Sequence, residues 1–222
     1  MKAIESVLLD FDGTLLDSNG AHAVAWKEYL KAATGLDLPV GRVALMIGMG
    51  GDKIIRQLFG DRHSDSQIKN MTEKRDEHYL KTQMTRMKPV AGAVEFTGEL
   101  ARRGFQVAIA SSARHELLDP ALKLVPIQPY VVGFSTPDEA PQSKPSPDIF
   151  LAAMKKFSFD PNRTAVIGDS PYDMQAGRDA GCKALVAVLS GHFSSADLSI
   201  ADVVYKDVDE LRRLLGSSIL MR

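Results

Sequence analysis

The sequence predicts an α/β protein in which a Rossmann-like, doubly wound parallel sheet carries an inserted α-helical cap. From residue 87 onward, short apolar runs alternate with helical patterns, which is typical of a parallel sheet whose strands are joined by helices. Residues 17–86 show only helical patterns, although an apolar strand precedes them. We therefore expect a core domain made of residues 1–16 and 87–222, and a helical cap domain made of residues 17–86.

The first strand is expected at residues 6–9, a short apolar run. The expected helices of the cap lie at residues 21–33, 52–59 and 64–84. Ser18 or Asn19 is placed to cap the first of these helices, and Asp52 the second. Between them, the stretch Gly48-Met49-Gly50-Gly51 interrupts the helical pattern.

The remainder of the chain alternates between the two element types. Further strands are expected at residues 106–110, 130–134, 164–168, 184–189 and 202–205. Helices are expected at residues 94–103, 147–157, 172–180 and 208–215. Residues 15–18 and 85–90 are then the two connections between the core and the cap.

Composition excludes several function classes. The chain has 222 residues, 45% of them hydrophobic and 25% charged, and its formal net charge of −1 gives no bulk attraction to nucleic acid or to a membrane surface. A single cysteine excludes an intramolecular disulfide. No apolar run reaches transmembrane length and no signal-peptide pattern is visible, so we expect a cytoplasmic protein with neither a nucleic-acid nor a membrane partner.

Chemistry-bearing residues follow the first strand directly, as Asp10-Phe11-Asp12-Gly13-Thr14. Ligands of an open α/β sheet bind at the carboxyl ends of its strands. Two carboxylates this close repel each other and favour a bound cation, and oxygen ligands suit Mg²⁺. For these five residues alone, the alternative interpretation is an acidic turn that caps the next helix.

Three more expected strand or loop ends add to this edge of the sheet. They are Ser111-Ser112, Lys144 before a helix, and Gly168-Asp169-Ser170 with Asp173 four residues after Asp169. Carboxylates, a hydroxyl and a lysine together are what phosphoryl transfer through a carboxylate needs. In this interpretation Asp10 is the nucleophile and Asp12 the general acid and base. Lys144 and Ser111 hold the transferring oxygens, Asp169 completes the metal shell, and Asp173 binds the metal directly or through water.

These four segments, in this order, resemble the motifs of the haloacid dehalogenase superfamily, and the resemblance covers about residues 5–215. It implies an aspartyl-phosphate mechanism with Asp10 as nucleophile. It also implies Mg²⁺ as cofactor, bound by Asp10, Asp169 and the carbonyl oxygen of Asp12. The helical insertion is placed like the small α-helical cap of the first type in that superfamily, which closes over the substrate.

Within the superfamily, the sequence favours a phosphatase acting on a small phosphomonoester, such as a sugar phosphate or a phosphoglycolate-like metabolite. The alternative is a β-phosphoglucomutase-like isomerase, which the cap start from Asp17 to His22 resembles. Such mutases need a cap arginine for a second phosphate, and this chain has Gly51 or Lys53 there, with Arg56 one turn on. A third hypothesis, a non-catalytic binding protein, is disfavoured because every expected catalytic position is filled.

The substrate-binding residues that we expect are Ser112, Lys53, Gly51 and His22. The expected partner is a small phosphorylated metabolite, and the expected state is a monomer or a weak homodimer.

Overall fold

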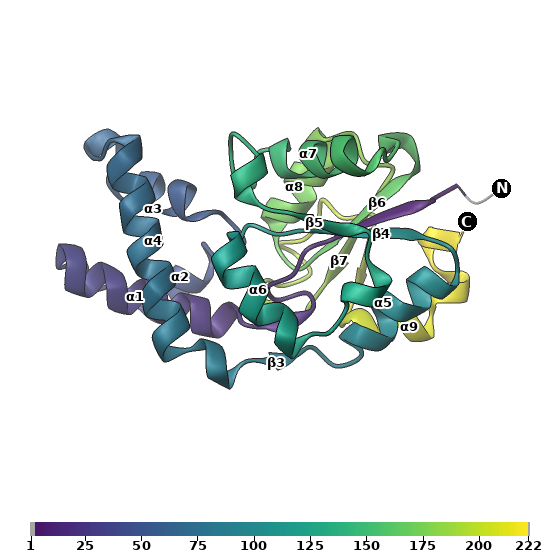
Figure 1. Ribbon diagram of the computed structural model, residues 1–222, viewed down its shortest axis with the longest axis horizontal. Coiled ribbons are helices and arrows are strands. Elements are labelled where there is room, and N and C mark those ends of the chain that lie inside the picture. Colours follow the sequence, from purple (N-terminus) through teal and green to yellow (C-terminus); the bar gives the residue numbers. More distant parts are fainter. Residues whose placement is uncertain (1–2, 222) are drawn as a thin grey trace.

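The computed structural model describes residues 3–221. Figure 1 shows a mixed α/β body that holds both chain ends, and a cluster of helices beside it. Within the described residues the main sheet has six strands, all parallel, in the order β5-β4-β1-β6-β7-β8. Its strands are β1 (Ser6–Leu9), β4 (Gln106–Ala110), β5 (Gly133–Ser135), β6 (Thr164–Gly168), β7 (Ala184–Val188) and β8 (Val203–Tyr205). The predicted doubly wound parallel sheet is therefore confirmed.

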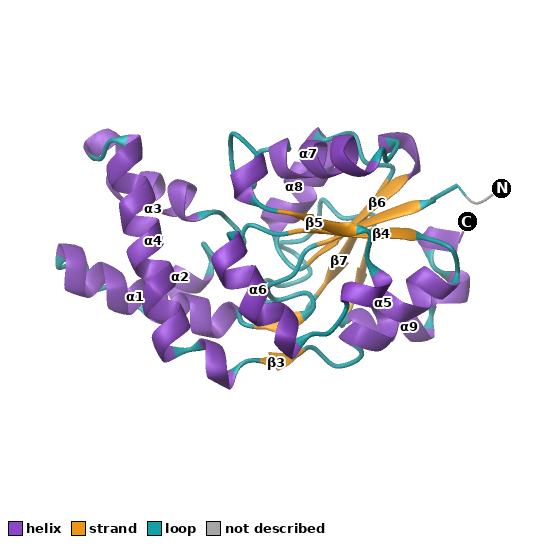
Figure 2. Cartoon of the chain, viewed as in Figure 1, coloured by secondary structure: helices purple, strands orange, loops and turns teal. Residues whose placement is uncertain are grey.

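Helices cover both faces of this sheet, as Figure 2 shows. They are α5 (Ala93–Arg102), α6 (His115–Leu124) and α9 (Val208–Arg213) on one side, and α7 (Asp148–Phe157) and α8 (Pro171–Asp179) on the other. Successive side chains of a strand point to opposite faces. Val7 and Leu9 therefore enter the core with α5 and α9, while Leu8 enters the core with α7 and α8. The first strand is buried on both faces, which explains its continuous apolar run.

The separate cluster consists of α1 (Asn19–Thr34), α2 (Val40–Ala44), α3 (Gly51–Phe59) and α4 (Asp65–Thr82). These helices surround a hydrophobic core of their own, which includes Trp26, Leu30, Ile54 and Ile68. We refer to them as the cap. Two short strands, β2 (Leu16–Asp17) and β3 (Lys88–Pro89), pair in antiparallel fashion where the chain enters and leaves the cap. This pairing was not predicted, because two residues are too few to show an alternating pattern.

One helix of the core was also not predicted. Helix α6 contains Pro120, which removes a backbone donor from the helix interior. Its apolar residues nevertheless follow helical spacing: Leu117, Leu118, Ala121 and Leu122 are all buried. The strand expected at 130–134 is instead a 3-10 turn at Gln128–Tyr130 followed by β5. No helix within residues 3–221 combines the length and the apolarity needed to cross a membrane.

The predicted capping side chains are used elsewhere. Ser18 occupies the position before α1, but its Oγ donates to Asp12 Oδ1 at 2.5 Å and makes no cap bond. Asp52 lies inside the first turn of α3, and its carboxylate accepts a hydrogen bond from Ser143 Oγ of the core. The predicted N-cap position of Ser18 is confirmed, although its side chain makes no cap bond, whereas the prediction that Asp52 caps α3 was wrong because Gly50 is the N-cap residue. Both side chains face the junction between the cap and the core.

Candidate active site

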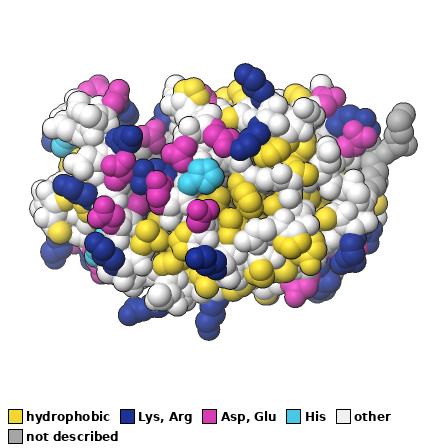
Figure 3. All heavy atoms as spheres, in the orientation of Figure 1, with side chains coloured by type: hydrophobic (Ala, Val, Ile, Leu, Met, Phe, Trp, Pro, Cys, Tyr) yellow, Lys and Arg dark blue, Asp and Glu magenta, His cyan; other side chains and the backbone are white. Residues whose placement is uncertain are grey.

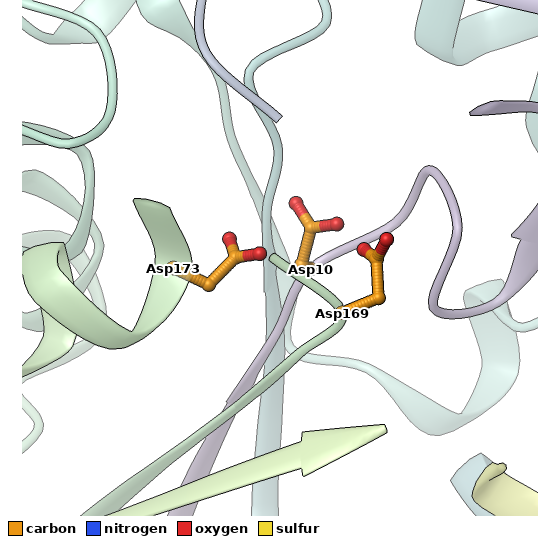
Figure 4. A group of neighbouring side chains, drawn as sticks. All are labelled: Asp10, Asp169 and Asp173. Carbon is orange, nitrogen blue, oxygen red and sulfur yellow. The ribbon is translucent and has the colours of Figure 1, made fainter. Parts of the chain in front are cut away.

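Three carboxylates meet at the carboxyl end of the sheet. Asp10 follows β1, Asp169 follows β6, and Asp173 lies in the first turn of α8. Figure 4 shows their side chains directed toward one another. One oxygen from each of the three lies within 4.8 Å of the others, and all three residues are buried. The ends of β1 and β6 therefore bring Asp10 next to Asp169, which is 159 positions further along the sequence, as the α/β interpretation predicted.

Lys144 joins two of these carboxylates. Its Nζ lies 2.6 Å from Asp10 Oδ1 and 2.7 Å from Asp173 Oδ1, and it donates to the carbonyl oxygen of Ala110 at 2.8 Å. The Lys144 side chain is 0% exposed. A buried ammonium group needs such partners, since its charge would otherwise be strongly disfavoured. The sequence-predicted lysine is thus fixed at the nucleophile and at the end of β4.

Asp169 is held by two residues that follow β1. Thr14 Oγ1 donates to Asp169 Oδ1 at 3.2 Å, and Asn19 Nδ2 donates to Asp169 Oδ2 at 2.7 Å. Asp173 accepts hydrogen bonds from the backbone N–H and the hydroxyl of Ser170, in a capping box at the start of α8. Thr14 and Asn19 were not predicted as site residues. Asn19 is notable because it is the first residue of α1 and so joins the cap to this cluster.

The charge balance of the cluster favours a bound cation. Burial and the nearby Asp173 raise the pKa of Asp10 from 3.8 to about 7, against the opposing effect of Lys144. Burial together with Asp10 and Asp173 raises the pKa of Asp169 as well. Burial lowers the pKa of Lys144, but the two carboxylates outweigh it and raise that pKa overall. Three carboxylates against one lysine leave an excess of negative charge, and a set of buried carboxylate oxygens fits Mg²⁺.

Asp12 has a different environment from Asp10, although only Phe11 separates them. Its Oδ1 accepts from Ser18 and lies 3.1 Å from Nε2 of His22, a buried residue of α1. Burial would raise the pKa of Asp12, but His22, Ser18 and the guanidinium of Arg75 together lower it. Its side chain therefore faces the cap and lies outside the acidic cluster. The predicted role of its carbonyl oxygen as a metal ligand stays a prediction.

Arg75 of α4 was not predicted as a site residue. Its Nη2 lies 2.7 Å from His22 Nδ1, and because a guanidinium can only donate, Nδ1 accepts and Nε2 carries the hydrogen toward Asp12. The guanidinium also lies 4.8 Å from the ring centroid of Trp26. The signal for Arg75 was present in the sequence: it is seven residues after Ile68 and four before Tyr79, on the buried face of a mostly charged helix.

A small cavity of about 60 Å³, which we name the inner cavity, lies between this site and the cap. Asp10, Asp12, His22, Gly51 and Ser112 are among its lining residues. Ser111 is buried at the end of β4, and its Oγ accepts from the backbone N–H of Ala113 at 3.0 Å. Lys53 points away from the inner cavity, and its Nζ donates to Gln142 Oε1 of the core at 2.8 Å. Of the four residues predicted to bind substrate, Lys53 is thus the exception.

The glycines of the stretch Gly48-Met49-Gly50-Gly51 allow this part of the cap to contact the core closely. A Cβ on Gly48, whose φ is +107°, would lie 2.7 Å from Ser170 Oγ, next to Asp169. A Cβ on Gly50 would lie 2.3 Å from Ser143 Cβ, next to Lys144. Ser112 Oγ also donates to the carbonyl oxygen of Gly48 at 3.1 Å. The stretch from Gly48 to Gly51 therefore packs against the loops that carry Lys144 and Asp169. This close contact is possible only because Gly48 and Gly50 have no side chain.

Comparison with known proteins agrees with this geometry. The family of haloacid dehalogenase-like hydrolases matches residues 7–187. The chain belongs to this family. The haloacid dehalogenase-like chain is 29% identical over 182 residues to a phosphoglycolate phosphatase of Nitrosospira multiformis, and the match covers 80% of each protein.

Solved structures give the same result for the fold. A hydrolase from Pseudomonas syringae has a TM-score of 0.86 and 31% identity, covering 96% of this chain and 98% of that one. A structure from Bacteroides vulgatus, named as a candidate β-phosphoglucomutase, has a TM-score of 0.84 over 96% of this chain and 88% of that one. Its identity of 24% shows the fold alone. The predicted resemblance to the haloacid dehalogenase superfamily is therefore confirmed.

Proposed function

We propose that this haloacid dehalogenase-like hydrolase is a Mg²⁺-dependent phosphatase, which hydrolyses a small phosphomonoester through an aspartyl-phosphate on Asp10. The observation that carries the proposal is the contrast between Asp10 and Asp12. Asp10 lies in an acidic, lysine-linked cluster, whereas Asp12 faces the cap and its hydrogen-bonding partners. Two carboxylates in different environments are suited to two different roles in one reaction.

In the first step, a carboxylate oxygen of Asp10 attacks phosphorus and the bond from phosphorus to the leaving oxygen breaks. Asp12 gives its proton to that oxygen, so the leaving group departs as a neutral alcohol. Lys144, 2.6 Å from Asp10 Oδ1, offsets negative charge at the nucleophile and on the transferring oxygens. This step needs Asp12 in its protonated form. His22 is one of the groups that lower the pKa of Asp12, so moving His22 away from Asp12 favours protonation.

In the second step, water hydrolyses the aspartyl-phosphate. Asp12, now ionised, takes a proton from the water, the oxygen of the water bonds to phosphorus, and Asp10 is released as a carboxylate with inorganic phosphate. The lowered pKa of Asp12 in the arrangement with His22 keeps this carboxylate ionised, which is the form that accepts the proton. The two steps together return both carboxylates to their starting states.

Asp10, Asp169 and Asp173 are the side chains that would hold Mg²⁺, with the carbonyl oxygen of Asp12. When bound, Mg²⁺ neutralises phosphoryl charge and orients the oxygens for in-line displacement. The cap excludes water from the site, and residues 17–86 are its proposed extent, with the β2–β3 pair as the hinge. Ser112, Gly51 and His22 line the inner cavity and are the proposed substrate contacts there. A cytoplasmic location and a monomeric or weakly dimeric state stay predictions from the sequence.

A mutase is the second candidate, and one observation favours keeping it: two arginines, Arg75 and Arg114, line the inner cavity. Both are already paired, since Arg75 Nη1 lies 2.9 Å from Asp76 Oδ1 and Arg114 Nε lies 3.0 Å from Asp76 Oδ2. An arginine that holds a second phosphate would have to give up these partners. We therefore rank the phosphatase first.

The test is release of inorganic phosphate from a panel of phosphomonoesters, with Mg²⁺ and with EDTA. The panel contains phosphoglycolate, pentose and hexose phosphates, nucleoside monophosphates and β-glucose 1-phosphate. We expect metal-dependent release that is lost in Asp10→Asn and kept in Asp61→Asn, whose side chain is fully exposed on the cap. Conversion of β-glucose 1-phosphate to its 6-phosphate after priming with the bisphosphate, without phosphate release, would establish the mutase instead.

A further inference from the structure

The first turn of helix α1 in the cap contacts two carboxylates of the core. Ser18 Oγ, just before the helix, and His22 Nε2 both contact Asp12 Oδ1. Asn19, the first residue of α1, contacts Asp169 instead, because its Nδ2 donates to Asp169 Oδ2 at 2.7 Å. Asn19 is only 4% exposed. A buried residue of the cap is therefore bonded directly to a side chain proposed to hold Mg²⁺.

This hydrogen bond differs from the ion pairs that join the cap to the core. Figure 3 shows charged side chains of both signs gathered on the face where the cap meets the core. One such pair joins Arg114 of the core to Glu73 of α4, and both side chains are partly exposed, so that water and salt weaken their attraction. The bond from Asn19 to Asp169 is buried and ends on a carboxylate, which makes it stronger than a bond between neutral groups.

One oxygen of Asp169 is enclosed by the chain around it. A Cβ on Gly13 or on Gly191 would overlap Asp169 Oδ2, so both backbone positions lie against this oxygen. Asn19 Nδ2 occupies a further side of it. The other oxygen, Oδ1, accepts from Thr14 Oγ1 at 3.2 Å, which uses one of its lone pairs. Oδ1 is therefore the oxygen of Asp169 that can still bind a cation.

The orientation of the Asn19 amide is fixed by Asp169. Rotating the amide by half a turn would bring Asn19 Oδ1 against Asp169 Oδ2, and two acceptors repel each other. In the orientation observed, Asn19 Oδ1 is buried and has no hydrogen-bond donor within residues 3–221. A buried acceptor without a donor lowers stability. The amide is thus explained by the bond that its nitrogen makes to Asp169, and not by a contribution of its oxygen to the fold.

We propose that Asn19 is a positioning residue for the metal: it holds Asp169 in the orientation that binds Mg²⁺, and it does so from the first turn of the cap. The inference rests on the proposed Mg²⁺ site and adds a cap residue to it. Hydrogen-bonding partners of metal ligands typically change metal affinity by roughly 10- to 100-fold. Because coupling between two events is reciprocal, metal binding should in turn stabilise the first turn of α1.

The test compares two variants of Asn19 with a matched control. Asn19→Leu removes the donor and keeps a side chain of similar size, whereas Asn19→Ala removes the donor and leaves space. Asn70→Ala is the control, because Asn70 is an exposed asparagine of the cap helix α4. Mn²⁺ is the probe, since sites made of carboxylates suit Mn²⁺ as well as Mg²⁺. Its binding to the metal-free full chain is measured from the electron paramagnetic resonance signal of free Mn²⁺, with Mg²⁺ as competitor, and circular dichroism in EDTA shows whether each variant is folded.

We expect both Asn19 variants to raise the Kd for Mn²⁺ and for Mg²⁺ by roughly tenfold or more, and Asn70→Ala to stay within about twofold. Phosphate release by the Asn19 variants should need a correspondingly higher Mg²⁺ concentration, and at saturating Mg²⁺ their kcat should return to within about threefold of the unmodified protein. An unchanged Kd in a folded variant would overturn the proposal, whether or not kcat falls. A lower kcat that saturating Mg²⁺ does not restore would also overturn it, because Asn19 would then act on something other than metal binding.

Hydrogen exchange tests the connection to the cap. The backbone N–H of His22 donates to the carbonyl oxygen of Ser18 at 2.9 Å and reports on the first turn of α1. Mg²⁺ should slow its exchange in the unmodified protein and in Asn70→Ala, and have a smaller effect in Asn19→Leu at the same fraction of metal bound. Equal slowing in all three would overturn the connection.

The binding measurements separate this inference from the phosphatase. If no substrate releases phosphate but the Asn19 variants bind Mn²⁺ more weakly, the phosphatase fails and the role of Asn19 stands. If the unmodified protein does not bind Mn²⁺, the metal site fails and the role of Asn19 fails with it.

Discussion

Replacing the proposed nucleophile should make the metal-free protein more stable. Asp10 is buried, and its pKa in the folded protein is about 7, against an ordinary value of 3.8. Between these two values the folded state binds more protons at Asp10 than the unfolded state does, so this group lowers stability as pH rises from about 4 to about 7. Asp10→Asn has no such charge, and its free energy of unfolding should lack this dependence on pH.

The size of the effect follows from the shift of about three pKa units. At pH 8 Asp10 lowers the free energy of unfolding by about 4 kcal/mol. At pH 5 it lowers it by about 2 kcal/mol, because Asp10 then stays mostly protonated in the folded state. For a protein of this size the larger value corresponds to a rise in Tm of roughly 10 °C for Asp10→Asn at pH 8. These values are upper bounds, since the Asn variant also loses the charge-assisted bond to Lys144.

The assay is thermal unfolding followed by circular dichroism in EDTA, at pH 5 and pH 8, with Asp61→Asn as the control at a fully exposed site. Asp10→Asn should exceed the unmodified protein in Tm, and by more at pH 8 than at pH 5. Saturating Mg²⁺ should reduce or reverse the difference in Tm between Asp10→Asn and the unmodified protein, because the cation offsets the charge of the Asp10 carboxylate. The raised pKa of Asp10 would be refuted if Asp10→Asn were no more stable than the unmodified protein at pH 8, or if the difference in Tm between them were as large at pH 5 as at pH 8.

Three further predictions follow from buried contacts. Lys144→Met should abolish phosphate release and lower the free energy of unfolding by roughly 3–5 kcal/mol in urea, because it leaves buried carboxylates unpaired; a fully active Met variant would contradict this. Gly48→Ala should cost about 1–3 kcal/mol of stability and lower kcat, since its φ is +107° and its Cβ would meet Ser170; a neutral effect in both measurements is the opposing result. In a double-mutant cycle, Asp52→Ala and Ser143→Ala should lower kcat non-additively, because they remove the same hydrogen bond; additive losses would mean that the two side chains act separately.

Most of the sheet was predictable because its strands, except β5, carry their signal locally. The run Val7-Leu8-Leu9 must be buried on both faces, and polar residues at strand ends meet at one edge whatever the details of packing. Asp10, Lys144, Asp169 and Asp173 could be placed together on that basis. The β2–β3 pair and helix α6 gave weaker signals, since one is too short for a pattern and the other contains Pro120.

The contacts between cap and core could not be predicted in the same way. Whether Ser18 caps a helix or donates to Asp12 depends on how the cap is seated, which no local pattern encodes. The same holds for Lys53, whose partner Gln142 is 89 positions away. Arg75 is an intermediate case, because its place on a buried helix face was readable, but its contact with His22 was not.

The pairing of Leu16 with Pro89 has a consequence for engineering. Paired strands lie about 5 Å apart, so the chain leaves and re-enters the α/β body at nearly one point. A helical unit whose own ends are equally close can be spliced in there without changing the length of any strand in the sheet. We therefore expect the cap to be exchangeable, and we expect hybrids that keep the α/β body but carry a foreign cap to differ in substrate choice.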